Sequence, residues 1–488
     1  MLSRRLLTYE LIVALTCIGV AGDEAAGQDR FRALGGERSA WAALDGADVN
    51  TAEADGTTAL HWAALRNDAE SVARLIGSGA DVNAQNDLGA TALWAASQNG
   101  SEEVVATLLA AGANPNAALR NGETPLMTAS RSGNPLVVEA LLQSGSDPDA
   151  TGPRDQTALM WAAAQGHSEV VAVLIEGSAD VHARSEVWRM FMAQPPAPHP
   201  QHRGWFEHGG NTALLFAARA GDLASALLLV AAGADVDDRS GWGLSALTLA
   251  AYSDFGPLVI RTRGTAFRIS GQEVYQRGGH AEVVEFLLEA GADPNAGAGQ
   301  FTALHAAIMR RDETRVDLLL SHGANPNLTL GAWTPLDRGS GTNYYFHRAW
   351  VGAPPVWLAA RFGTPEILRR LVEDGADPEY IHRGEHYAGG LGGELSEVQA
   401  EITSPLMATV GLSRTGRSWV YQEPESDEYE AEVLEKVKFF IELGVDLNAV
   451  NQRGLAALDA AIALEYDSVA DLLIASGAQQ GPGPTQVG

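Results

Sequence analysis

The chain has 488 residues, more than one compact core usually organises, so it must form several domains or one elongated array of repeats. Apolar residues make up 46% of it and charged residues 19%, a composition that favours a folded, largely helical protein over a disordered one. The formal net charge of −28 argues against sequence-independent binding to nucleic acid, because phosphate contacts need clustered Lys and Arg.

The N-terminal residues look like a bacterial export signal. Arg4 and Arg5 precede an apolar run from Leu11 to Gly22, and small residues follow it where a signal peptidase would cut. We therefore expect a signal peptide over residues 1–27 and an exported protein, periplasmic or secreted. A cytoplasmic protein with a loose N-terminal tail is the alternative.

The single cysteine, Cys17, lies inside this leader. Cleavage would leave a chain without thiols, which excludes disulfides, thiolate metal sites and a cysteine nucleophile. After the leader, no apolar run reaches the roughly 18 to 20 residues that a membrane span needs. We therefore expect no membrane insertion once the signal is removed.

A tetrapeptide that begins with Thr recurs every 33 residues in the first part of the chain. The copies are Thr58–His61, Thr91–Trp94, Thr124–Met127 and Thr157–Met160. Small residues, a turn, an apolar segment and a Gly-Ala or Gly-Ser step follow each copy. Such a period is typical of a solenoid built from one repeated supersecondary unit. The Thr hydroxyl suits a helix N-cap, and the Gly suits the left-handed end of a second helix.

This unit resembles the ankyrin repeat, and the resemblance covers about residues 35 to 478. It implies an all-α repeat solenoid of about ten helix-turn-helix units with short β-hairpin fingers. Further units begin at Thr212, Ser245, Thr302, Pro354, Ser404 and Ala456. The resemblance also implies a concave face, formed by fingers and first helices, that binds other macromolecules.

After the fourth unit, five inserted loops interrupt the 33-residue spacing. They lie near residues 183–211, 253–279, 329–351, 378–403 and 411–432. The first, third and fourth should extend fingers, whereas the second and fifth separate the two helices of one unit. We expect regular repeats over 35–182, repeats with insertions over 183–432, C-terminal repeats over 433–478 and a disordered tail over 479–488.

The insertions are rich in aromatic residues, which exposed loops usually avoid. Two interpretations remain open: these rings pack the loops onto the repeats, or they form interface hot spots. The candidate partner-binding residues are Trp188, Trp205, Phe206, Tyr344, Tyr345, Phe346, Trp350, Trp419 and Tyr421. The first three insertions also carry more Arg than acid, which suits an acidic partner or a polyanionic glycan, or else ordinary solvated loops.

His199, His202 and His208 cluster in the first insertion, but their spacing matches no metal motif. We therefore predict no metal site, no cofactor and no catalytic residue. The predicted function is a non-catalytic, monomeric scaffold that binds another protein through the concave face and the insertions. One alternative is a small-ligand or metal-binding accessory protein with a pocket made by the insertions, and another is a secreted effector.

Overall fold

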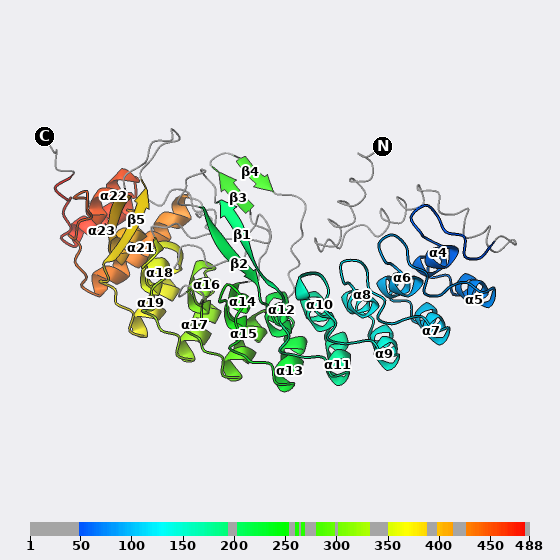
Figure 1. The fold of residues 1–488 in the computed structure, drawn as a ribbon. Helices are drawn as coiled ribbons and strands as arrows, with labels where there is room; N and C mark the ends of the chain where they lie inside the picture. Colours follow the sequence, from blue (N-terminus) through cyan, green and yellow to red (C-terminus); the bar gives the residue numbers. More distant parts are fainter. Residues whose placement is uncertain are drawn as a thin grey trace. The chain divides into compact units, whose positions relative to one another are not determined.

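A computed structural model describes residues 48–193, 203–252, 259–262, 265–268, 280–297, 301–331, 350–387, 398–412 and 426–483. The described residues divide into two compact units, 48–153 and the residues from Arg154 onward. Each unit is a row of antiparallel helix pairs (Figure 1). The predicted leader, residues 1–27, lies outside the described residues.

Three helix pairs form the described part of the first unit. They are α4 (Ala59–Leu65) with α5 (Ala69–Gly77), α6 (Ala92–Asn99) with α7 (Glu102–Ala110), and α8 (Pro125–Ser132) with α9 (Pro135–Gln143). A 3-10 turn, η1 (Pro153–Asp155), follows them in the chain.

Seven pairs form the described part of the second unit, which brings the total to the ten predicted. They are α10 (Ala158–Gln165) with α11 (Ser168–Glu176), α12 (Ala213–Ala220) with α13 (Leu223–Ala231), α14 (Ala246–Tyr252) with α15 (His280–Glu289), α16 (Ala303–Met309) with α17 (Glu313–Ser321), α18 (Pro355–Phe362) with α19 (Pro365–Glu373), α20 (Pro405–Thr409) with α21 (Ser426–Glu442), and α22 (Ala457–Ala463) with α23 (Asp467–Ala475). The predicted all-α repeat solenoid is confirmed. None of the described helices is long and apolar enough to cross a membrane.

Within each unit, the first helix of a pair packs on the first helix of the next, and second helices pack on second helices. In the first unit α4 contacts α6 and α6 contacts α8, while α5, α7 and α9 form the parallel row. In the second unit the same order runs from α10 to α22 and from α11 to α23. Small residues allow the close approach: Ala64 and Ala218, for example, are completely buried.

The ends of the helices follow the sequence signals. Thr91 and Thr124 accept hydrogen bonds through their hydroxyls from the amides three residues later, at 3.2 and 3.3 Å. Gly100, with φ +63°, ends α6 in the left-handed region.

His61, the last residue of the first tetrapeptide, joins two repeats through its ring. The Thr58 amide donates to Nδ1 of His61 at 3.2 Å, so that nitrogen carries no proton. Nε2 therefore carries it and donates to the Ala90 carbonyl of the next repeat at 2.8 Å. Thr302 and His305 repeat the first of these contacts in α16. The neutral ring is thus part of the packing between repeats.

A second row of polar contacts joins the ends of the second helices. The Asn83 side chain donates to the Gly112 carbonyl at 3.1 Å and accepts from the Asn114 amide at 2.7 Å. Asn50 and Asn116 make the same pair of contacts one repeat earlier and one repeat later. Each of these asparagines comes shortly after a Gly-Ala pair in the repeat. The hydrogen bonds explain why asparagine recurs at this position.

Three antiparallel two-stranded sheets lie within the predicted insertions. They are β1 (Val187–Ala193) with β2 (Arg203–Gly209), β3 (Val259–Thr262) with β4 (Thr265–Arg268), and β5 (His382–Tyr387) with β6 (Val398–Thr403). The first and third lie between helix pairs and extend fingers, whereas β3 and β4 separate the two helices of one pair. This is the placement that the repeat spacing predicts.

Two boundaries differ from the prediction. Helix α21 begins at Ser426, so the end of the expected insertion 411–432 is helical. The expected disorder from residue 479 is wrong for residues 479–483. There, the Gly481 amide donates to the Asp459 carboxylate at 2.8 Å and the Gly483 amide donates to the Gly454 carbonyl at 3.0 Å. These hydrogen bonds hold the segment against the last repeat.

His305 should make stability depend on pH. Burial lowers its pKa from 6.5 to about 4. The unfolded chain takes up a proton there below pH 6.5, whereas the folded chain stays neutral until about pH 4. Stability therefore falls as pH drops through this window, by up to about 1.4 kcal/mol per pH unit.

Urea unfolding at pH 7 and pH 5 measures this effect. We expect His305→Gln to lose less stability between the two pH values than the wild type, because glutamine does not titrate. Replacement of the exposed His322 by Gln is the control and should keep the wild-type dependence. An unchanged dependence in His305→Gln would contradict the assignment.

Candidate functional site

The β1–β2 hairpin adds a ribbon to the repeats without interrupting their packing. Its register runs from Val187 opposite Gly209 to Ala193 opposite Arg203. Helices α10 and α12, on either side of it in the chain, still contact each other directly. The repeats therefore do not need this hairpin in order to stack.

Four side chains stack at the base of the hairpin. The Arg154 guanidinium lies 3.9 Å from the centre of the Trp188 ring. Trp188 and His208 are stacked with ring centres 4.6 Å apart, and His208 lies 5.5 Å from Trp242 of the next finger. His208 is only 2% exposed, while Trp188 and Trp242 are partly exposed. The stack fixes the hairpin to the fingers on both sides of it.

Arg184 adds polar anchors beside this stack. Its Nη1 donates to the carbonyls of Gly210 and Arg239 at 3.1 and 2.9 Å, and its Nη2 pairs with Asp238. Burial raises the pKa of Asp238 above its ordinary value, and Arg184 opposes that shift. Two carbonyls and a carboxylate thus hold one guanidinium, a geometry that restricts the hairpin base.

The chain reverses at the hairpin base where only glycine fits. Gly209 has φ +79°, and a Cβ there would lie 1.9 Å from the Glu186 carbonyl oxygen. Gly210 has φ +63° and lies against the backbone of Gly241. The hairpin is therefore held by backbone contact as well as by side chains.

The β5–β6 hairpin is fixed in a different way. Trp357 occupies the fourth position of its tetrapeptide, which is His in the repeats of α4 and α16. Its Nε1 donates to the Thr403 hydroxyl at 3.0 Å. The Trp357 and His382 rings lie 4.8 Å apart. From the far side, Gln452 of the last finger accepts from the Ile402 amide at 2.8 Å. Both finger hairpins are thus preorganised extensions of the repeats.

The predicted aromatic residues do not form one surface. Trp188 lies in the stack, and Trp205 and Phe206 lie in β2 opposite Phe191 and Met190. The prediction that Trp350 binds a partner is wrong. Trp350 is 1% exposed and its ring centre lies 4.7 Å from that of Phe362, so it belongs to the core. The others, Tyr344, Tyr345, Phe346, Trp419 and Tyr421, lie outside the described residues.

The histidines of the first insertion are divided in the same way. His208 is enclosed by two indole rings, and His199 and His202 lie outside the described residues. In the part of the chain that the structure describes, no three His, Cys, Asp or Glu side chains are grouped as metal ligands.

Helix α21 is unlike the other second helices, and the sequence analysis overlooked it. It has 17 residues, whereas α17, α19 and α23 have 9 each. The additional turns reach three other repeats. Glu432 pairs with Arg311, Tyr429 accepts from Arg361 at 3.0 Å, and Glu430 accepts from the Ser468 amide at 2.9 Å.

Lys436 is the buried centre of this region. It is 1% exposed, its Nζ lies 2.8 Å from Glu432, and it also donates to the Ala360 carbonyl at 3.4 Å. Burial lowers its pKa to about 8, and Glu432 opposes the shift. The positions equivalent to Lys436 in α15 and α19 hold the apolar residues Val283 and Ile367. A lysine at a core position was therefore the sequence signal for this region.

We call Arg311, Arg361, Tyr429, Glu432 and Lys436 the α21 clamp. Arg311 belongs to the α16–α17 pair and Glu432 to the α20–α21 pair, with the α18–α19 pair between them. In a simple solenoid each repeat contacts only its neighbours. The clamp therefore couples repeats that stacking alone leaves independent.

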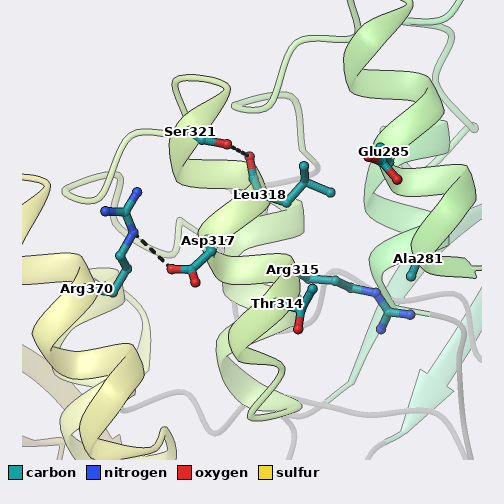
Figure 2. A pocket seen from close by; sticks show the side chains of 8 residues that line it. All are labelled: Ala281, Glu285, Thr314, Arg315, Asp317, Leu318, Ser321 and Arg370. Atoms are coloured by element: carbon teal, nitrogen blue, oxygen red, sulfur yellow. Dashed lines mark hydrogen bonds and ion pairs between the residues drawn. The ribbon is translucent and has the colours of Figure 1, made fainter.

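A shallow depression of about 560 Å³ lies on the second helices (Figure 2). It is lined by Ala281, Glu285, Thr314, Arg315, Asp317, Leu318, Ser321 and Arg370. Arg370 pairs with Asp317 at 3.0 Å, and Arg315 pairs with Asp312 at 2.9 Å. Three charged residues of its lining, Arg315, Asp317 and Arg370, are thus paired within the protein, and the hollow is open to solvent.

Family models agree with this architecture. A model described as ankyrin repeats (3 copies) matches residues 36–119, 111–185 and 274–382, and a single ankyrin-repeat model matches 209–241. Together these matches cover more than half of the chain. The chain belongs to the ankyrin-repeat family.

Ankyrin repeats generally mediate protein–protein interactions, and they bind protein partners. No curated protein matches this chain. The additions of this chain to the ankyrin repeat are the two finger hairpins and the α21 clamp.

Gly209→Ala should loosen the β1–β2 hairpin. Alanine at positive φ costs about 1 kcal/mol, and the close Glu186 oxygen adds to that cost. We expect faster hydrogen exchange of the hairpin amides, with the helical circular dichroism retained. Gly233→Ala is the matched control, since Gly233 has φ +100° with open space around its Cβ. Equal exchange in both variants would contradict the proposed contact.

Glu432→Gln should destabilise the α21 clamp by about 3 kcal/mol, because it leaves the buried Lys436 ammonium without its counter-ion. Lys436→Met should cost less, since Glu432 keeps Arg311. Lys438→Met removes the exposed pair with Glu435 and is the control, expected to change stability by less than about 1 kcal/mol. Urea unfolding followed by tryptophan fluorescence gives the comparison. A cost for Glu432→Gln as small as that of the control would disprove the clamp.

Proposed function

We propose that this ankyrin-repeat protein is a non-catalytic scaffold that binds a macromolecular partner through its first-helix and finger side, with the β1–β2 and β5–β6 hairpins as the specific elements. The observation that carries the proposal is that both hairpins are rigidly attached but are not needed for stacking. Helices α10 and α12 contact each other across one insertion, and α18 and α20 across the other.

Rigid attachment matters because ordering a loop on binding costs free energy. A hairpin already fixed by Trp188, His208 and Arg184 avoids most of that cost. The exposed side chains of the hairpin are also suited to contact with a partner. Val187 is 52% exposed, and Arg189 and Glu207 form an exposed cross-strand pair at 2.7 Å. An apolar side chain beside fixed charges of both signs favours a protein partner over a polyanion.

Export remains part of the proposal. It depends on the leader-like residues 1–27, and detection of an uncleaved N-terminus on the purified protein would remove it. A periplasmic or secreted scaffold would meet its partner in the cell envelope or outside the cell.

Deletion of residues 187–208 tests the role of the hairpin. This deletion restores the 33-residue spacing between Thr157 and Thr212, so the repeats should still fold. Affinity purification from envelope and soluble fractions, quantified by mass spectrometry, should lose the partner of the full chain. Circular dichroism and urea unfolding check that the repeats persist.

A second variant separates recognition from fold. The exchange Arg189→Glu with Glu207→Arg keeps an ion pair but reverses the charge at both positions, so it should weaken partner binding without changing stability.

Equal recovery of the partner by the full chain and by the deletion variant would move recognition to the regular repeats and overturn the role given to the hairpin.

A further inference from the structure

The described helix pairs end with α22 and α23, at the red end of the chain in Figure 1. Each earlier pair of this unit is covered by the pair that follows it. A terminal repeat in a solenoid normally replaces the exposed apolar positions with polar ones. The last pair here departs from that rule.

Ile462, the sixth residue after the N-cap of α22, shows the departure. The equivalent residues of the six preceding pairs are at most 1% exposed: Ala163, Ala218, Ala251, Ile308, Ala360 and Val410. Ile462 is 46% exposed. A large β-branched side chain therefore occupies a position that a following repeat buries everywhere else in this unit.

Ile474 shows the same change on the second helix. Of its equivalents in this unit, Leu288 and Leu320 are 5% and 6% exposed and four others, Ile175, Val230, Val372 and Ile441, are half-buried, whereas Ile474 is 56% exposed. The tail segment 479–483 does not replace the missing cover. It contacts Gly454 and Asp459 near the start of the pair, and both isoleucines remain exposed.

The two helices that carry these isoleucines, with the loop between them, are acidic. Residues 454–480 contain four carboxylates and neither Lys nor Arg. Three of the four, Glu465, Asp467 and Asp471, are exposed. A second copy of the chain, docked end to end, would bring these like charges together, which is unfavourable. The charge favours a basic partner.

We propose that this end surface, defined by Ile462, Ile474, Glu465, Asp467 and Asp471, binds an amphipathic helix of another protein with Lys or Arg beside its apolar stripe. A helix is the occupant that fits, because the helices of the following repeat bury the equivalent of Ile462 in every earlier pair of this unit. The apolar stripe covers the isoleucines and the basic residues face the carboxylates. The surface is separate from the hairpins.

The probe is a fluorescein-labelled 18-residue helical peptide with Leu at positions i, i+4 and i+7 and Lys at the flanking positions. Fluorescence anisotropy with the full chain measures its affinity. The test variant is Ile462→Ser with Ile474→Gln. Serine is native at the equivalent of Ile462 in two earlier repeats, as Ser97 and Ser130, so the variant should fold. We expect binding to weaken at least about tenfold.

Leu136→Gln is the matched control, since Leu136 is a 52% exposed residue of α9 in the first unit, and it should bind like the wild type. A peptide with Glu in place of Lys should bind much more weakly. Deletion of residues 187–208 should leave peptide binding unchanged, which separates this surface from the hairpin.

Three results would overturn the proposal. One is equal weakening by Leu136→Gln and the double variant, which would mean non-specific adsorption. Another is equal affinity for the Glu and Lys peptides. The third is a dimer in sedimentation experiments that the double variant abolishes, which would assign the end surface to a second copy of this chain.

Discussion

Close contact between successive first helices is the constraint on which the other features of this protein depend. Residues such as Ala64 and Ala218 have no exposed surface, because the next first helix lies directly on them. A larger side chain requires space that the stack rarely offers. The neutral His61 ring and the Asn83 side chain add hydrogen bonds between repeats at two other levels. Within each unit, successive repeats are thus joined by helix packing and, at several steps, by such polar contacts as well.

Because stacking depends on contacts between helices, a finger can be lengthened without disturbing it. The chain accommodates β1–β2 and β5–β6 between helix pairs without separating the helices on either side. It then fixes each hairpin with residues that differ between them, a ring stack with Arg184 in one and the Trp357 indole in the other. Function in a repeat family resides in such additions, since the shared scaffold specifies a shape and no partner.

The α21 clamp departs from the rule that repeats interact only with their neighbours. Burying Lys436 is costly, and Glu432 compensates only because Arg311 and the Ala360 carbonyl complete the network. The result joins the repeats from α16 to α23 through one helix. The end surface beyond it has the opposite character, with apolar residues that no described repeat covers. Cooperative coupling and an open end thus occur next to each other in the second unit.

The sequence by itself determined the repeat, the ten helix pairs and the places of the insertions, because a 33-residue period, N-cap Thr and helix-ending Gly act locally. It did not determine the ring stack at Trp188, which needs Arg154 and Trp242 from neighbouring fingers. Nor did it separate Trp350, a core residue, from aromatics at the surface. The α21 clamp joins residues more than a hundred positions apart. Such contacts were decided by tertiary structure alone, since burial and charge pairing depend on which surfaces meet and not on the order of residues.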